Sequence, residues 1–514
     1  MGFNSFTFIM LFLPILLAGW HSINRAGKYA VADIFLILMS LYFYYSFGLS
    51  FLLVLLLSLA VNYGLSFLME CSGEKGQRKL LKTVGVLFNL ALLFYFKYMG
   101  FFVENFNSLT GATLTAKEIL MPIGISFFTF GQISFIVDRA NGEAPHYPLI
   151  QYVMYTVYFP KLIQGPIAFH REMIDQFTDK KLRKYDPEKM AKGIMSFIIG
   201  LSKKVLLADT LSKMVVYGFH YTYYLDTLTV IVVMLAYTFQ IYLDFSGYCD
   251  MANGVSLMLG FKLPVNFNSP YKAATAKELW QRWHMTLSRF FIKYVYIPLG
   301  GSRKGKIRTI INVLVVFVLS GLWHGAGWTY ICWGLMQGLL VVWDNLGIVG
   351  VKESSHNKES AKEGKKAGYL LRDTPLFVIP RALGNAMTFI MFVISLIFFG
   401  SKNMTYAIQM FKRLVFWTYP GFLYRTAENL EIAENYVLRQ LLSQMGKDEM
   451  IIVIYMLTMI LLLLVSAFVM TRKNTGEIIE RACFDKKTVV WLTVLFIWSF
   501  VSLSNVSTFI YFQF

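Results

Sequence analysis

The chain is organised around residues 280–333, WQRWHMTLSRFFIKYVYIPLGGSRKGKIRTIINVLVVFVLSGLWHGAGWTYICW. This stretch contains two Trp-His dipeptides, Trp283-His284 and Trp323-His324, forty residues apart. The whole chain of 514 residues has only 7 His and 10 Trp, so chance would give well under one such pair. The repeated dipeptide therefore makes His284 and His324 the first candidates for functional residues.

The two halves of this stretch differ in charge. Residues 268–308, the cationic platform, hold nine Lys or Arg against one acidic residue, Glu278. From Thr309 to Gly327 no charged residue appears, yet His324 lies near the end of a run long enough to enter a bilayer. A neutral imidazole at membrane depth is costly unless it faces a cavity or a partner, so His324 is a functional candidate. The nine cations are Lys272, Lys277, Arg282, Arg289, Lys293, Arg303, Lys304, Lys306 and Arg308.

Both histidines also have a structural interpretation. His324 could be an interfacial side chain bonded to a backbone carbonyl, and His284 a helix-surface side chain near lipid headgroups. Gly321, Gly325 and Gly327 favour a functional role for His324. Glycines have no side chain to cover the histidine, so another molecule can approach the backbone closely. For His284 both interpretations stay open.

Composition identifies the class of protein. The chain is 56% hydrophobic, 17% aromatic and 15% charged, with a mean hydropathy of +0.53, which predicts an all-α polytopic membrane protein. Its net charge of +18 does not require a nucleic-acid partner, because nearly half lies in the cationic platform and the rest in short loops beside a lipid bilayer. The four cysteines show no metal-ligand spacing, so neither a disulfide framework nor a metal site is expected.

The apolar runs predict roughly eleven transmembrane helices plus re-entrant or interfacial helices. We expect Pro122, Pro160 and Pro166 to mark helix breaks inside the membrane. Basic loops place the cationic platform and segments 77–82, 171–192, 352–372 and 472–487 in the cytoplasm. The runs are 6–20, 31–47, 50–69, 80–98, 119–137, 152–167, 193–217, 228–245, 310–322, 328–342, 376–399, 451–470 and 489–503.

Chemistry in such a chain must come from polar residues embedded in apolar runs, because no soluble catalytic motif is present. Asp244 and Asp250 have a structural alternative that we favour, pairing with Arg282 or Arg289, since intramembrane acids usually have cationic partners. The embedded polar residues are Gln240, Asp244, Ser246, Asp250, His284, Ser288, Ser320 and His324.

Three consecutive motifs carry a family resemblance. They are FSGYCDMANGVSLMLGFKLPVNFNSPY (245–271), LWQRWHMTLSRFFIKYVYIPLGGSR (279–303) and SGLWHGAGWTYICWGLMQG (320–338). Together with KLIQGPI (161–167), they resemble the membrane-bound O-acyltransferases, in particular the bacterial branch of the alginate O-acetyltransferase membrane subunit. The teichoic-acid D-alanyltransferase membrane subunit is a relative of that branch. The resemblance covers most of the chain.

The resemblance implies one membrane domain over residues 1–514 around a central tunnel. Its parts would be N-terminal spans (1–137), a catalytic core (138–345), a flexible cytoplasmic loop (346–375) and C-terminal spans (376–514) with an external segment, 402–449. It also implies that His324 is the catalytic histidine and His284 a second active-site position. No cofactor is expected to be bound.

The implied reaction moves an acyl group, acetyl above all, from a cytoplasmic thioester to an exported cell-surface polysaccharide. The donor would be acetyl-CoA or an acyl carrier protein, and a separate external SGNH-type transferase would be a partner at the bacterial cell membrane. Lipid-headgroup acylation and D-alanyl transfer to teichoic acid stay open as alternatives. A transporter would instead predict internal repeats and matched broken helices, which the sequence does not show.

Acyl transfer assigns roles to the candidate residues. His324 would be the base that takes the hydroxyl proton, and His284 or Ser288 would bond the thioester carbonyl or the developing oxyanion. The cationic platform would receive the acidic donor. The expected substrate-binding residues are Asp244, Ser246, Ser288, Ser320, Trp323, Arg282, Arg303 and Lys304.

The chain ends on an apolar segment, FIYFQF (509–514). An interfacial aromatic anchor or a packing plug is one interpretation. The segment also resembles a C-terminal motif that some members of this branch carry. In that interpretation Tyr511 is catalytic: its phenol accepts the acyl group as an aryl ester and passes it to an external transferase.

Overall fold

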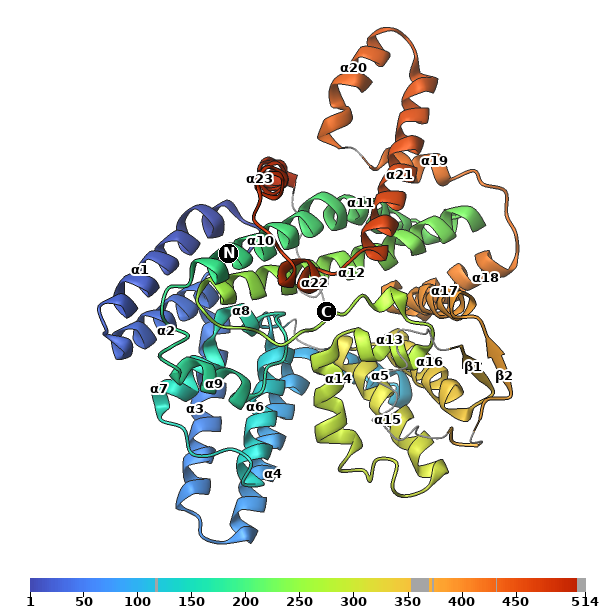
Figure 1. The fold of residues 1–514 in the computed structure, drawn as a ribbon. Coiled ribbons are helices and arrows are strands. Elements are labelled where there is room, and N and C mark those ends of the chain that lie inside the picture. Colours follow the sequence, from blue (N-terminus) through green and yellow to red (C-terminus); the bar gives the residue numbers. More distant parts are fainter. Residues whose placement is uncertain (116–118, 353–368, 372–373, 431, 506–514) are drawn as a thin grey trace. The chain divides into compact units, whose positions relative to one another are not determined.

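The computed structural model describes residues 1–115, 119–352, 369–371, 374–430 and 432–505, and these are predominantly helical (Figure 1). Strands β1 (Val349–Val351) and β2 (Phe377–Ile379) form a short parallel pair. The prediction of an all-α polytopic fold is confirmed, apart from this small pair. Most of the expected flexible loop lies outside the described residues.

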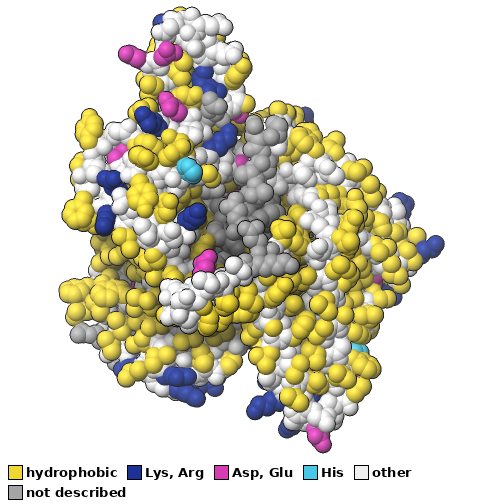
Figure 2. Space-filling model, turned by 180° about the vertical axis from the view of Figure 1, so that it is seen from behind, with side chains coloured by type: hydrophobic (Ala, Val, Ile, Leu, Met, Phe, Trp, Pro, Cys, Tyr) yellow, Lys and Arg dark blue, Asp and Glu magenta, His cyan; other side chains and the backbone are white. Residues whose placement is uncertain are grey.

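Seven helical segments of the described chain are long and apolar enough to cross a membrane. In Lys75–Thr110 and Asp448–Thr471 only 11% of the apolar window is buried, so most side chains of these helices are free to face lipid. Figure 2 shows hydrophobic side chains over much of one face, with Lys and Arg in small groups. The other five segments are Phe8–Arg25, Leu49–Cys71, Thr227–Met258, Lys306–His324 and Arg381–Gly400.

Two of the predicted helix breaks coincide with helix boundaries. Helix α6 (Ile125–Ala140) begins three residues after Pro122, and α7 (Leu149–Val157) is separated from α8 (Phe159–Leu162) just before Pro160. Pro166 lies in the non-helical segment after α8. Proline interrupts helices at these places because its nitrogen carries no hydrogen and its ring clashes with the preceding turn.

The chain divides into two compact units that alternate along the sequence. The first comprises Met1–Ser202, Phe245–Val265 and Thr475–Phe514; the second comprises Lys203–Asp244 and Asn266–Asn474. Helix α12 (Thr227–Met258) contributes to both. These units do not follow the divisions predicted at residues 137, 345 and 375, which stay predictions.

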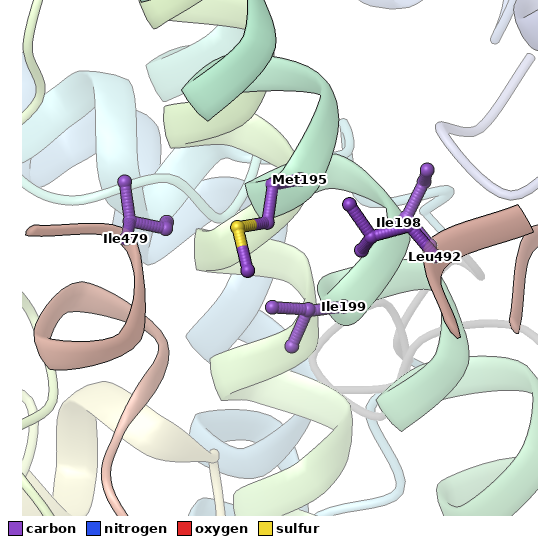
Figure 3. Close-up of a cluster of buried hydrophobic side chains, with 5 residues drawn as sticks. All are labelled: Met195, Ile198, Ile199, Ile479 and Leu492. Atoms are coloured by element: carbon purple, nitrogen blue, oxygen red, sulfur yellow. The ribbon is translucent and has the colours of Figure 1, made fainter. Parts of the chain in front are cut away.

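The first unit joins the N-terminal helices to the end of the described chain. Met195, Ile198 and Ile199 lie three and four residues apart on α10, which gives one apolar face. That face packs on Ile479 and Leu492 (Figure 3). Its elements are η1 (Phe8–Phe12), α1 (Leu13–Arg25), α2 (Tyr29–Tyr45), α3 (Leu49–Cys71), α4 (Lys75–Leu93), η2 (Phe94–Tyr98), α5 (Met99–Thr110), α6 to α8, α9 (His170–Thr178), α10 (Pro187–Ser202), α22 (Thr475–Glu480), α23 (Lys486–Val501) and η9 (Ser502–Asn505).

The second unit contains both Trp-His dipeptides and the cationic platform. The predicted external segment holds three of its helices, α18 to α20. The elements are η3 (Lys203–Ala208), α11 (Asp209–His220), η4 (Thr222–Tyr224), η5 (Pro270–Lys272), α13 (Ala276–Arg282), α14 (Met285–Phe291), η6 (Ile292–Tyr296), α15 (Lys306–His324), α16 (Trp328–Leu346), β1, β2, α17 (Arg381–Gly400), α18 (Met404–Val415), α19 (Leu423–Glu428), η8 (Ala433–Asn435), α20 (Tyr436–Gln444) and α21 (Asp448–Thr471).

Candidate active site

His284 occupies a sharp turn between two short helices. Helix α13 ends at Arg282, Trp283 is extended, and α14 begins at Met285. His284 itself has φ 45° and ψ 49°, the left-handed region that few residues other than glycine adopt. The side chain is fully buried, and burial lowers the pKa of the imidazole to about 3. The His284 imidazole is therefore neutral, and its backbone is held in the left-handed conformation.

Asn266 holds this turn in place. Its backbone carbonyl accepts a hydrogen bond from Met285 N at 3.0 Å. Its side-chain Oδ1 lies 3.1 Å from His284 Nδ1 and accepts from the Thr286 amide at 3.3 Å and the Thr286 hydroxyl at 2.9 Å. Both polar ends of one asparagine thus fix the residues on either side of the left-handed position. Sequence reasoning missed Asn266, although it lies inside the motif VNFNSPY.

His324 is the last residue of α15 and is surrounded by aromatic rings. Its ring centroid lies 4.9 Å from that of Trp323, 5.2 Å from Trp333 and 5.2 Å from Phe399. The His284 ring is 6.4 Å away, so the tertiary structure brings the two histidines into one site. His324 is 2% exposed. The site is an apolar enclosure with two imidazoles, suited to proton transfer away from bulk water.

The glycines near His324 let α16 approach α15. A Cβ on Gly321 would meet Tyr330 O at 2.2 Å, and one on Gly334 would meet Phe317 O at 2.3 Å. Figure 1 shows the two helices side by side. A Cβ on Gly325 would meet the Tyr330 ring at 2.1 Å. The expectation that Gly321 and Gly325 leave room for another molecule is therefore wrong, because this chain fills the space itself.

A buried hydrogen-bond network links three helices of the second unit. Trp280 Nε1 of α13 donates to Gln337 Oε1 of α16 at 3.2 Å, and Gln337 Nε2 donates to Ser395 Oγ of α17 at 2.6 Å. The Trp280 ring also packs edge-on against Trp333, at 5.7 Å. These hydrogen bonds fix the position of the Trp280 indole, which packs against Trp333. Sequence reasoning missed this network, although a single Gln337 within an apolar run was a signal for it.

Asp244 has a different partner from the one expected. Its Oδ1 lies 2.6 Å from Lys204 Nζ, and the same ammonium lies 2.8 Å from Asp209 Oδ1. All three side chains are at most 4% exposed. The structural interpretation of Asp244 is supported, with Lys204 in place of the arginines named from sequence. Its expected substrate-binding role is not, because the carboxylate is committed to a buried ion pair.

Two further expected substrate-binding groups are engaged elsewhere. Arg282 pairs with Glu278 at 2.9 Å, and Glu278 also pairs with Arg381 at 2.6 Å. Ser288 Oγ donates to the Trp280 carbonyl at 3.3 Å. Glu278, the single acid of the cationic platform, therefore offsets the charge of Arg282 in part. The Ser288 hydroxyl is used in a bond to the backbone. A direct role in binding substrate is not supported for either.

Of the remaining predicted residues, some lie in the site with the histidines and others lie in the first unit. Ser320 is buried one turn before His324 on α15, and Trp323 is 5.7 Å from the His284 ring, so both belong to the site. Ser246 is buried in the first unit. Asp250 is in that unit too and accepts a hydrogen bond from Thr475 Oγ1 at 2.6 Å. Tyr511 lies outside the described residues.

The cationic platform is not one uniform patch. Lys272 Nζ donates to a backbone carbonyl, and Lys277 Nζ bonds Asn345, so several of its cations have local structural partners. The part before and at the start of α15 carries four cations that are all exposed, of which Arg308 donates through Nε to the Leu299 carbonyl at 3.4 Å. These four, the exposed cations of the platform, are Arg303, Lys304, Lys306 and Arg308.

Comparison with known proteins gives matches over most of the chain. Residues 37–355 match the family model for MBOAT, the membrane-bound O-acyltransferase family, and this range contains both histidines. A peptidoglycan O-acetyltransferase of Helicobacter pylori is 33% identical over 441 residues, covering 80% of this chain and 79% of that protein.

Two other relatives differ in the polymer that their names give. A probable alginate O-acetylase, AlgI, of Pseudomonas aeruginosa is 36% identical over 347 residues, covering 66% of this chain and 65% of that protein. A teichoic acid D-alanyltransferase of Streptococcus thermophilus is 27% identical over 303 residues, covering 56% and 70%. The three names give peptidoglycan, alginate and teichoic acid as the polymers that are acylated.

Proposed function

Since this chain belongs to the membrane-bound O-acyltransferase family and is a multi-pass membrane O-acyltransferase, we propose that it O-acetylates an exported cell-surface polysaccharide with His324 as the general base. The acyl donor is a thioester used from the cytoplasmic side, and the protein resides in a bacterial cytoplasmic membrane. Relatives named for peptidoglycan and alginate O-acetylation support a glycan acceptor.

The observation that carries this proposal is the buried pair of histidines. Two imidazoles whose ring centroids are 6.4 Å apart lie behind aromatic side chains, in a unit where α15 reaches the site from an exposed cationic end. A hydroxyl must lose its proton to attack a thioester, and an imidazole close to neutral pKa is suited to take it. Excluding water limits hydrolysis of the thioester.

The reaction at His324 returns its proton within the site and needs no further reactant. The hydroxyl oxygen attacks the thioester carbonyl carbon while its proton passes to the imidazole. The tetrahedral intermediate then expels the thiolate, which takes the proton back from His324. The new ester C–O bond thus replaces the C–S bond, and the base is regenerated without a bound cofactor.

The exposed cations of the platform supply the docking surface for the donor. Both candidate donors are acidic: acetyl-CoA through its phosphates and an acyl carrier protein through its surface carboxylates. Arg303 and Lys304 are exposed, and they gain attraction to such a partner without giving up an internal ion pair. Arg282 would have to share its charge between such a partner and Glu278, with which it pairs at 2.9 Å.

The acyl group reaches the glycan through an external partner. Tyr511 would take the acyl group as an aryl ester, and a separate SGNH-type transferase would receive it. Direct transfer to the polymer is the competing route. D-alanyl transfer to teichoic acid is the second candidate function, because one relative carries that name.

The test is His324→Ala in the full-length protein, expressed in a strain that lacks the native copy. We expect polymer-bound acyl groups to fall at least about 100-fold, as for loss of a general base. The matched control is His220→Ala, which removes an exposed histidine. Near wild-type acylation by a well-expressed His324→Ala protein would overturn the proposal, and released acetate or D-alanine after mild base would separate the two candidate functions.

A further inference from the structure

The hydrogen bonds of Asn266 determine which of its amide atoms faces His284. One atom lies within hydrogen-bonding distance of the Thr286 amide, the Thr286 hydroxyl and His284 Nδ1. A backbone N–H can only donate, so its partner must be the oxygen Oδ1 and not the amide nitrogen. The contact to Thr286 N therefore fixes the orientation of the Asn266 side chain.

This orientation fixes the proton on the imidazole. Oδ1 has no hydrogen to donate, so His284 Nδ1 must carry the proton in the 3.1 Å contact. A neutral imidazole has one N–H, and the full burial of His284 favours the neutral ring. Its other nitrogen, Nε2, then carries a lone pair.

We propose that Asn266 is a positioning residue that holds His284 in the Nδ1–H tautomer, so that Nε2 accepts a hydrogen bond from bound substrate. This inference rests on the proposed function, since it concerns the same site. In this tautomer Nε2 has no hydrogen, so His284 cannot donate from Nε2 to the thioester carbonyl, as the sequence analysis had expected. The group that meets Nε2 must carry O–H or N–H, as do the hydroxyl of an acyl acceptor and the amides of a phosphopantetheine arm.

The thioester oxygen then needs another donor, and Trp333 provides an independent observation. Trp333 is 2% exposed, and its Nε1 has no hydrogen-bond partner within the described ranges. Indole N–H is a donor only, and buried indoles usually find a partner. The neighbouring Trp280 shows this rule, since its Nε1 donates to Gln337.

We infer that Trp333 Nε1 donates to the carbonyl oxygen of the bound thioester. Its ring lies edge-on to His324 with centroids 5.2 Å apart, so the donor and the base belong to one site. When the hydroxyl oxygen attacks, the carbonyl π pair moves onto this oxygen, and the indole N–H stabilises the resulting oxyanion. The C=O bond re-forms as the thiolate leaves.

The tautomer is tested directly on the full-length protein in lipid bilayers. Solid-state NMR of ¹⁵N-histidine-labelled protein distinguishes Nδ1–H from Nε2–H imidazoles, and His284→Asn assigns the signal among the 7 histidines. We expect Nδ1–H for His284 in the wild type. An Nε2–H signal would overturn the inference, whatever the fate of the proposed reaction, because this measurement needs no turnover.

Kinetics test the positioning role. Asn266→Asp keeps an oxygen acceptor and should retain activity within about 10-fold, whereas Asn266→Ala should lower kcat about 100-fold. Thr286→Val removes the hydroxyl bond to Oδ1 but leaves the contact of Oδ1 with His284, so it should lower kcat less than Asn266→Ala does. A raised KM confined to the donor or to the acceptor substrate identifies which of them meets Nε2. Equal losses in Asn266→Asp and Asn266→Ala at unchanged protein stability would contradict positioning.

Trp333→Phe tests the second inference, because it removes the N–H and keeps an aromatic ring. We expect kcat to fall about 100-fold with little change in donor KM. Trp328→Phe, on the same helix and 55% exposed, is the matched control. A Trp333→Phe protein with wild-type kcat would remove Trp333 from the reaction and leave the tautomer of His284 unaffected.

Discussion

Lys204 and Asp244 form an ion pair of 2.6 Å in which neither side chain is more than 2% exposed. Asp209 binds the same ammonium at 2.8 Å, so two carboxylates share one cation. Removing one partner of such a group leaves charge buried without compensation, which costs about 3–5 kcal/mol, whereas neutralising the whole group is often tolerated.

Lys204→Met should therefore destabilise the protein by about 3–5 kcal/mol. The triple variant Lys204→Met, Asp209→Asn, Asp244→Asn should be clearly more stable than Lys204→Met alone. Thermal unfolding in detergent micelles measures both. If the triple variant unfolds earlier than the single one, the triad is not the source of the loss.

Close packing of α15 on α16 predicts a strong effect at a single glycine. Gly334→Ala places a Cβ 2.3 Å from the Phe317 carbonyl, so the helices must separate, at a cost of about 1–3 kcal/mol. Gly64→Ala is the control, because within the described part of the chain no atom outside the local backbone of α3 lies within 4 Å of the added Cβ. Melting temperatures compare the two variants. Equal temperatures would show that α15 and α16 can move apart freely.

Charge reversal tests the donor-docking surface. Arg303→Glu, Lys304→Glu and Lys306→Glu together should raise donor KM about 10-fold or more, because exposed like charges then repel an acidic donor. In the wild type, raised salt should increase KM in the same direction through screening. Steady-state kinetics on proteoliposomes give both values.

The control reverses Arg481, Lys486 and Lys487, three exposed cations of the first unit, which changes the net charge equally. If both triple variants shift KM alike, net charge and not the docking surface is responsible. A salt-independent KM in the wild type would also remove electrostatic docking.

Tyr511→Phe tests the acyl relay, which rests on the sequence. A phenol ordinarily has a pKa near 10 and is a better leaving group than a sugar hydroxyl, so loss of the Tyr511 hydroxyl should stop a relayed transfer. We expect labelled acyl groups on the terminal peptide of the wild type and none on Tyr511→Phe. Full glycan acylation by Tyr511→Phe would leave direct transfer as the route. His324→Ala should lack the peptide label too.

The sequence alone determined the class of fold and the family, and it predicted where the chemistry takes place. Apolar runs of sufficient length predict membrane helices because each backbone group in lipid must bond within its own helix. Prolines predict interruptions by local sterics. Two rare Trp-His pairs made His284 and His324 the candidate site residues, and the surrounding motifs indicated the family. Each of these signals is carried by residues adjacent in the sequence.

Only the tertiary structure decided which distant groups meet. Lys204 is Asp244's partner because residues forty positions apart converge in one unit, and hydropathy contains no such pairing. The sequence around Gly321 suggested space for another molecule, but helix α16 occupies that space. The proton on His284 depends on Asn266 Oδ1, eighteen residues earlier. Periodicity and composition specify which side chains are buried, but packing alone selects the partner that satisfies each buried polar atom.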